Sequence, residues 1–220
     1  MTTESDLYDQ KSDDYFGYER PEIASLLPEA TNRVLELGCG SGATLRWLRA
    51  QRPVEYAVGI EMSPEASRRA TSVFDLVLTG NVETMELPGG GFDLILALDV
   101  LEHLVDPWTV VRRLHALLNP GGVIIVSLPN VGHYSVAVPL MLLGRWTYAD
   151  EGLLDRTHLR FFTRRTAIEL MTCSGLVMDK IAWTRIWRRR FTMKLVSRFL
   201  DHVLPGHLSG FQFLIRVKAP

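Results

Sequence analysis

Residues 34–42 read VLELGCGSG, and this short stretch carries the strongest structural signal in the chain. The apolar run 34–37 predicts a buried strand, and the glycines after it let the backbone turn sharply into a helix. That helix is expected to continue to about Gln51, because Leu45 and Leu48 are spaced for one inward face. Open α/β sheets bind ligands at such a turn, where glycines let the ligand approach the backbone.

The sequence around this turn repeats the same strand and helix units. Further apolar runs predict strands at residues 56–61, 76–78, 92–98 and 123–128. Ser63 and Asp106 are each followed by proline, which predicts a capped helix start at both places. Because the strands are almost wholly apolar and alternate with helices, they predict a doubly wound, Rossmann-like α/β sheet. Such a sheet is mostly parallel and carries helices on both faces.

The second half of the chain is less regular. Residues 130–162 show no clear pattern, and a connection of this length in a compact domain usually builds a functional loop. Thr163 predicts the cap of a helix that ends near Gly175. Residues 177–183 and 211–217 predict two last strands. The connection 130–162 is therefore expected to form the substrate side of the site.

We interpret residues 1–220 as one domain, because this length suits a single sizeable core. Its expected parts are an N-terminal helical cap (1–30), a cofactor-binding core (31–129), a substrate-side insertion (130–162) and a basic amphipathic insertion (184–209).

Composition excludes several classes of protein. The chain has 24 Lys and Arg against 25 Asp and Glu, without the basic excess usual in nucleic-acid binders. Its two cysteines are too few for a disulfide framework and lack metal-ligand spacing, so we expect no metal site. The acidic, polar start is unlike a signal peptide, and no apolar run reaches the roughly 20 residues that span a bilayer. A cytoplasmic protein, at most associated with a membrane, is expected.

Two carboxylates indicate which ligand the glycine turn binds. Gly38, Gly40 and Ala43 also satisfy the permissive dinucleotide pattern, so a nicotinamide-dependent oxidoreductase is one alternative. Glu36, however, would repel a pyrophosphate and suits a ligand that carries an ammonium and a sulfonium. Glu61 ends the next strand, where a carboxylate binds the hydroxyls of an adenosine ribose. An adenosine ligand with positive charge and no phosphate is S-adenosylmethionine.

The same residues resemble a known family. Residues 34–42 look like motif I of the class I S-adenosylmethionine-dependent methyltransferases. Residues 92–95 and 99–103 resemble the fourth strand and its exit in that family, and residues 118–122 resemble the turn before the fifth strand. The resemblance covers about residues 30–130.

The resemblance implies a seven-stranded sheet whose last strand, 211–217, runs antiparallel. It also implies that Glu36, Gly38 and Gly40 hold the methionine part of the cofactor and Glu61 the ribose. Asn81 and Val82 would lie at the adenine edge and Asp99 near the sulfonium, although the family more often has aspartate at position 81. The expected cofactor-binding set is Glu36, Gly38, Cys39, Gly40, Gly42, Glu61, Met62, Asn81, Val82 and Asp99.

The methyl acceptor is expected to be a small molecule, with S-adenosylhomocysteine as the second product. Residues 152–163 look like a segment of bacterial methyltransferases that modify sugars, lipids and other biosynthetic intermediates, and the N-terminal half resembles ubiquinone-type O-methyltransferases. The Asp/Asn-Pro-Pro-aromatic and Pro-Cys motifs of nucleic-acid methyltransferases do not occur after residue 98. A hydroxyl acceptor is expected. Two alternatives are an amine acceptor and a catalytically silent subunit that binds the cofactor.

A hydroxyl must lose a proton as it is methylated, and histidine is the usual base near neutral pH. His158 and His133 are the first candidates, because one lies in the insertion and the other follows the fifth strand. His103, after the fourth strand, is the third.

Residues 184–204 interleave basic and apolar side chains. At helical spacing, this pattern predicts an apolar face beside a basic one, as in helices that lie on anionic membranes. A cover packed on the sheet and a dimer contact are the alternatives, and the chain is expected to be a monomer or a homodimer.

Overall fold

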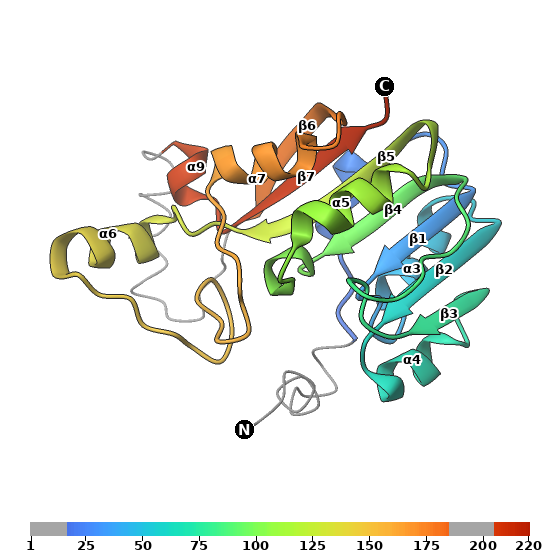
Figure 1. The fold of residues 1–220 in the computed structure, drawn as a ribbon, viewed down its shortest axis with the longest axis horizontal. Helices are drawn as coiled ribbons and strands as arrows, with labels where there is room; N and C mark the ends of the chain where they lie inside the picture. The colour runs from blue at the N-terminus through green and yellow to red at the C-terminus, as the bar shows by residue number, and fades with distance from the viewer. Residues whose placement is uncertain (1–16, 185–204) are drawn as a thin grey trace.

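Seven strands form one mixed sheet at the centre of the molecule (Figure 1). The computed structural model describes residues 17–184 and 205–220. The strands are β1 (Arg33–Leu37), β2 (Tyr56–Glu61), β3 (Leu76–Thr79), β4 (Phe92–Leu98), β5 (Leu118–Pro129), β6 (Val177–Thr184) and β7 (Gln212–Lys218). Their order in the sheet is β3-β2-β1-β4-β5-β7-β6.

The first five strands are parallel, and β7 runs antiparallel to both β5 and β6. This confirms the predicted sheet and its antiparallel last strand. From β1 the chain continues outward through β2 to β3, and it then returns to β4 on the other side of β1. The strand order therefore reverses at β1. Such a switch point opens a crevice at the carboxyl ends of the strands, where α/β sheets bind ligands.

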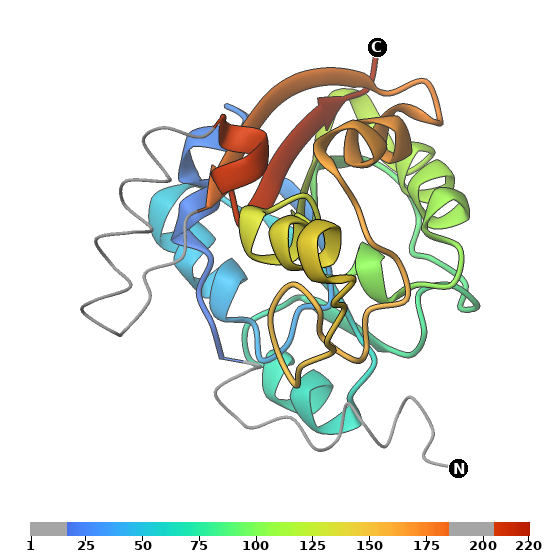
Figure 2. The ribbon, with the colours of Figure 1, turned by 90° about the vertical axis from the view of Figure 1, so that its left-hand side faces the viewer.

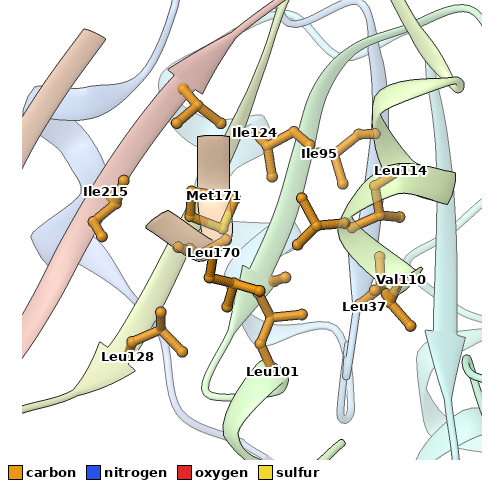
Figure 3. Packing of buried hydrophobic residues seen from close by; sticks show 14 of the residues in the cluster. Leu37, Ile95, Leu101, Val110, Leu114, Ile124, Leu128, Leu170, Met171 and Ile215 are labelled. Carbon is orange, nitrogen blue, oxygen red and sulfur yellow. The ribbon is translucent and has the colours of Figure 1, made fainter. Parts of the chain in front are cut away.

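Helices cover both faces of the sheet, as predicted (Figure 2). They are η1 (Pro21–Leu26), α3 (Ala43–Gln51), α4 (Pro64–Ala70), η2 (Leu101–His103), α5 (Pro107–His115), α6 (Tyr134–Leu143), α7 (Arg164–Thr172) and α9 (Gly206–Ser209). One core cluster packs α5 and α7 on the sheet, with Leu114 and Leu170 against Ile95 and Ile124 (Figure 3). A second cluster packs η1 and α3 on the other face.

The caps of α4, α5 and α7 form as the sequence indicates. The side chains of Ser63 and Asp106 accept hydrogen bonds from Ala66 N and Thr109 N, three residues along. Thr163 forms a capping box with Thr166. Each cap satisfies a backbone N–H that the first turn of a helix leaves unpaired, so these helix starts are fixed locally.

Two sequence expectations need correction. The connection 130–162 contains α6, which the sequence did not indicate because its apolar residues are nearly continuous and show no helical period. The fifth strand was expected at 123–128, yet it begins at Leu118. Its register against β4 shifts between the pairs Phe92–Leu118 and Leu94–Val123, and this irregularity accommodates the glycine turn before Val123. In Figure 1, α6 extends away from the sheet beyond the end of β5.

The structure describes only part of the expected N-terminal cap and of the basic segment. Thr184 is the last residue of β6 and Gly206–Ser209 form α9, whereas residues 185–204, the bulk of the basic segment, lie outside the described residues. Residues 1–16 of the expected helical cap also lie outside, and the described remainder holds the single short helix η1. Within residues 17–184 and 205–220, no helix is long and apolar enough to cross a membrane.

Candidate functional site

A cavity of about 470 Å³ opens at the carboxyl ends of β1, β2 and β4. Parallel pairing brings these ends to one edge of the sheet, since Leu37 of β1 lies beside Ile60 of β2 and Ala97 of β4. The residues that follow each strand therefore meet there. Nine of the ten predicted cofactor residues line the cavity: Glu36, Gly38, Cys39, Gly40, Glu61, Met62, Asn81, Val82 and Asp99.

The glycine turn forms one wall of this cavity. Gly38 and Gly40 have φ values of 62° and 53°, which glycine adopts far more readily than other residues. A Cβ at Gly38 would also lie 2.7 Å from Cγ2 of Val100. Gly42, the tenth predicted residue, lies outside the lining and is the N-cap of α3, with φ 84°. The glycine pattern thus predicts the turn as a whole, and it does not distinguish the glycines that line the cavity from the one that caps α3.

The side chain of Cys39, within the turn, is buried and packs in the hydrophobic core. Burial raises the pKa of its thiol above the ordinary range, and the nearby Glu36 and Glu61 raise it further. A thiol in this environment stays protonated, which disfavours a nucleophilic role for Cys39.

Glu36 places a buried carboxylate at the end of β1. It is 3% exposed, and Thr44 of α3 hydrogen-bonds to it. Its other oxygen, Oε2, has no hydrogen-bond partner among the described residues. Burial raises the pKa of this carboxyl to about 8, although Thr44 and Arg20 act in the opposite direction. A buried carboxylate is costly unless a donor or cation meets it, so Glu36 suits a ligand with positive charge.

Glu61 joins the glycine turn to the end of β2. Its Oε2 accepts a hydrogen bond from Gly40 N at 2.8 Å, and its Oε1 accepts one from Ser63 N at 2.9 Å. Each carboxylate oxygen can accept a further bond, so a ligand diol could still be held. The carboxylate therefore fixes the turn as well as offering acceptors to the cavity.

Arg20 also lines the cavity and was missed by the sequence reasoning. Its guanidinium donates to Glu22 at 2.6 Å, to Asp99 at 2.7 Å and to Ser127 at 3.1 Å. Burial alone would lower its pKa, but Asp99 and Glu22 outweigh this and raise it. No local pattern marks Arg20, because two of its partners, Asp99 after β4 and Ser127 in β5, are distant in the sequence. Thr44 was also missed, although a buried hydroxyl just after the glycine turn was a usable signal.

The far end of the cavity is formed by the loop after β3. Asn81 caps this loop, with its Oδ1 accepting from Glu83 N at 2.8 Å, and Val82 is buried against the core. The carboxylate of Glu83 in turn accepts from Val105 N and Asp106 N. This loop is thus tied to the loop after β4, and together they bound the end where the resemblance places adenine.

The three predicted histidines occupy different places. His103 lines the cavity, and its Nδ1 is 3.1 Å from the carbonyl oxygen of Thr157 in the insertion. His158 lies behind it, with the two ring centroids 4.8 Å apart. His133 caps α6, where its Nδ1 accepts from Ser135 N. The structure therefore brings His103, the third candidate, to the cavity. His158 and His133, the first two, have their Nδ1 atoms within hydrogen-bond distance of other residues of the insertion.

Glu102 is buried next to these histidines. Neither carboxylate oxygen has a hydrogen-bond partner in the part of the chain that the structure describes. Burial raises its pKa well above the ordinary value, and the charge on Asp99 adds to this. Ligand-type atoms of Glu102, His103 and His158 lie within 4.8 Å of one another. The cluster thus requires either a proton on Glu102 or a cation beside it.

Comparison with known proteins shows which family the chain belongs to. The model of the methyltransferase domain family matches residues 14–181. An uncharacterized methyltransferase of Mycobacterium tuberculosis is 33% identical over 108 residues, which are 47% of this chain and 54% of that protein. The chain thus spans about half the length of this relative. The ubiquinone biosynthesis O-methyltransferase of Pseudomonas aeruginosa is 31% identical over 167 residues, covering 69% of this chain and 71% of that protein.

A solved structure extends the likeness to the whole fold. It is an S-adenosylmethionine-dependent methyltransferase of Thermotoga maritima, described as a possible histamine N-methyltransferase. It superposes with a TM-score of 0.70 at 19% identity, covering 99% of this chain and all of that one. At this identity the likeness shows the fold. With the family match and the cavity at the switch point, the chain belongs to the methyltransferase domain family and has the class I, S-adenosylmethionine-dependent form of the fold.

Proposed function

We propose that the chain transfers a methyl group from S-adenosylmethionine to a hydroxyl of a small-molecule acceptor. The observation that carries the cofactor assignment is the buried carboxyl group of Glu36, a lining residue of the cavity whose Oε2 has no hydrogen-bond partner among the described residues. In its ionised form this carboxylate would pair with an ammonium group and repel a phosphate. Glu61, whose carboxylate faces the same space, adds acceptors suited to a ribose diol.

Methyl transfer needs alignment and, for a hydroxyl, removal of a proton. When bound, S-adenosylmethionine supplies the methyl group on a positively charged sulfonium. Asp99 lies on the cavity wall where β4 ends, and His103 lies on the same wall one turn further along. His103 is the histidine best placed to accept the hydroxyl proton, while His158 and His133 stay as predicted alternatives.

The hydroxyl acceptor is supported by the ubiquinone O-methyltransferase relatives, which cover about 70% of both chains. A transfer assay with S-adenosylmethionine labelled in its methyl group, run against hydroxyl and amine acceptors, tests it. Label on a hydroxyl compound is expected. Label confined to amines would favour N-methylation. Tight cofactor binding without transfer to any acceptor would favour a catalytically silent subunit.

Cofactor binding should release a proton from Glu36. Because the pKa of this carboxyl is about 8, most molecules carry the proton at pH 7. An ammonium favours the carboxylate form, so affinity should rise with pH and level off only above the pKa of Glu36, where its proton is already lost in the free protein. Calorimetry at pH 7 in buffers of different ionisation enthalpy should give nearly one proton released per cofactor bound.

Glu36→Gln provides the control, because it keeps the side-chain shape and removes the titration. This variant should bind the cofactor more weakly and release no proton at pH 7. Equal proton release by the variant and the unsubstituted chain would assign the linkage to another group and contradict this role of Glu36.

A further inference from the structure

Helix α6 (Tyr134–Leu143) presents an apolar surface outside the lining of the cofactor cavity. The helix carries no charged residue, and only Val136 among its ten residues is buried. A helix that is apolar all round is normally covered by a protein core or by lipid. The core leaves most of α6 uncovered, and the exposed large side chains of its second half are Val138, Leu140, Met141, Leu142 and Leu143. A contiguous apolar surface of this kind indicates an interaction site.

Only the base of α6 is packed against the rest of the fold. His133 caps the helix, and its ring meets that of Phe211 edge-on with the centroids 5.9 Å apart. The side-chain amide of Asn130 ties the preceding loop to α9 by two hydrogen bonds. In Figures 1 and 2, α6 extends from the end of β5 away from the sheet. Exposure reaches 77%, 68% and 74% at the tip, which consists of Met141, Leu142 and Leu143.

The backbone at this tip is closed by its own hydrogen bonds. Gly144 has φ 60°, and its N–H donates to Leu140 O. The N–H of Arg145 donates to Pro139 O. These bonds satisfy carbonyl groups that the last turn of a helix otherwise leaves unpaired. Since unsatisfied backbone groups are costly in lipid, a helix end closed in this way is suited to enter it.

The side chains that follow the tip suit the headgroup region of a membrane. Arg145 is exposed, and Trp146 and Tyr148 gather around the ring of Phe161, with the Trp146 and Phe161 centroids 5.0 Å apart. Tryptophan and tyrosine favour the boundary between lipid and water. A basic residue at that boundary is attracted to anionic lipids.

A basic part of the chain also begins and ends near the base of α6. Thr184 O accepts a hydrogen bond from Phe211 N, and Pro205 leads into α9, which Asn130 contacts. Between these two borders the sequence has a single acidic residue, Asp201. Its basic residues are Arg185, Arg188, Arg189, Arg190, Lys194 and Arg198. The apolar tip is thus combined with a positive charge that favours an anionic surface.

The size of α6 argues against a second copy of the chain as the occupant. The helix is about 15 Å long and about 10 Å wide, so one side of it presents about 250 Å². A stable interface buries about 800 Å² on each partner. A bilayer sets no such minimum, because each inserted apolar side chain contributes separately. The helix is about half as long as the hydrocarbon core is thick, so it reaches into one leaflet only.

We propose that the tip of α6 inserts into the surface of a lipid bilayer that contains anionic lipid. Met141, Leu142 and Leu143 enter the apolar layer, and Arg145 stays among the phosphates. Helix α6 follows the carboxyl end of β5, and the cofactor cavity lies at the carboxyl ends of the neighbouring parallel strands. Docking through α6 therefore turns this edge of the sheet towards the membrane.

Flotation of the full chain with vesicles of equal parts phosphatidylcholine and phosphatidylglycerol tests the proposal. The chain should float at low salt. Met141→Glu should weaken vesicle binding at least tenfold, because it removes an inserting side chain and puts a charge in its place. The matched control is Val177→Glu, which changes the net charge equally at an exposed position where β6 begins, away from α6. This control should float like the unsubstituted chain.

A fluorophore at the tip separates insertion from attraction by the basic residues. Leu142→Cys is labelled with nitrobenzoxadiazole in a Cys173→Ser background, because Cys173 is an exposed free thiol and Cys39 is buried. Vesicles should shift the emission of this label to the blue, as happens when the dye leaves water. The same label on Val177→Cys should show no shift.

Three results would overturn the proposal. The first is an unsubstituted chain that does not float, or a Met141→Glu variant that floats as well as Val177→Glu. The second is flotation without a blue shift at position 142, which would assign vesicle binding to the basic residues alone. The third is a dimer in sedimentation velocity that Met141→Glu converts to a monomer, which would make α6 a subunit contact. Circular dichroism shows whether Met141→Glu folds, and the labelled Leu142→Cys decides the matter should it not.

Discussion

Replacing His103 with alanine should lower the turnover number at least a hundredfold and leave the affinity for S-adenosylmethionine nearly unchanged. Loss of a general base typically costs a factor of about 10² to 10⁴ in rate. His103 lines the cavity, and its Nδ1 lies within hydrogen-bond distance of Thr157 O. Such a bond would place the hydrogen on Nδ1 and leave Nε2 as the accepting nitrogen. His103→Gln should show the same loss, because glutamine fills similar space without acting as a base.

Steady-state kinetics on the true acceptor, with cofactor affinity from calorimetry, measure both quantities. His115→Ala is a suitable control, because His115 lies on α5 with its Nδ1 near the carbonyl oxygen of Ser174, outside the cavity. His158→Ala and His133→Ala complete the series. Should all three candidate variants retain near-normal rates, no histidine base operates. An amine acceptor that needs only alignment would then explain the activity better.

Glu61→Ala should weaken S-adenosylmethionine binding at least tenfold while the domain stays folded. A hydrogen bond to a charged group contributes about 1.5–3 kcal/mol, which is roughly ten- to a hundredfold in affinity. The substitution also removes the acceptors of Gly40 N and Ser63 N, so the glycine turn itself should loosen. Glu61→Gln retains one carbonyl oxygen, so its affinity for S-adenosylmethionine should lie between that of Glu61→Ala and that of the unsubstituted chain.

Calorimetric titration gives the affinity, and thermal unfolding shows whether each variant is folded. Glu65→Ala is the matched control from the neighbouring turn, since Glu65 is exposed and pairs with Arg69 four residues along. Surface pairs of this kind contribute little, so this control should bind normally. An unchanged affinity of Glu61→Ala would show that the ribose lies elsewhere.

The sequence by itself determined the framework and most of the cofactor cavity. The strands 56–61 and 92–98 were predicted with the bounds that the structure has, because buried parallel strands read as continuous apolar runs. Glu36 and Glu61 were recognisable because each is a carboxylate at the end of such a run. A parallel sheet gathers the ends of its strands at one edge, so position along the chain was enough to place these groups together.

The tertiary structure alone decided which distant groups meet. Arg20 reaches Asp99 across 79 residues, and Gln212 reaches it across 113, through the antiparallel return of β7 beside β5. The sequence ranked His158 and His133 ahead of His103, yet the tertiary structure places His103 at the cavity and leaves His133 to cap α6. Local patterns specify periodicity and strand ends, whereas contacts between separate elements depend on strand order and loop paths, which no single segment encodes.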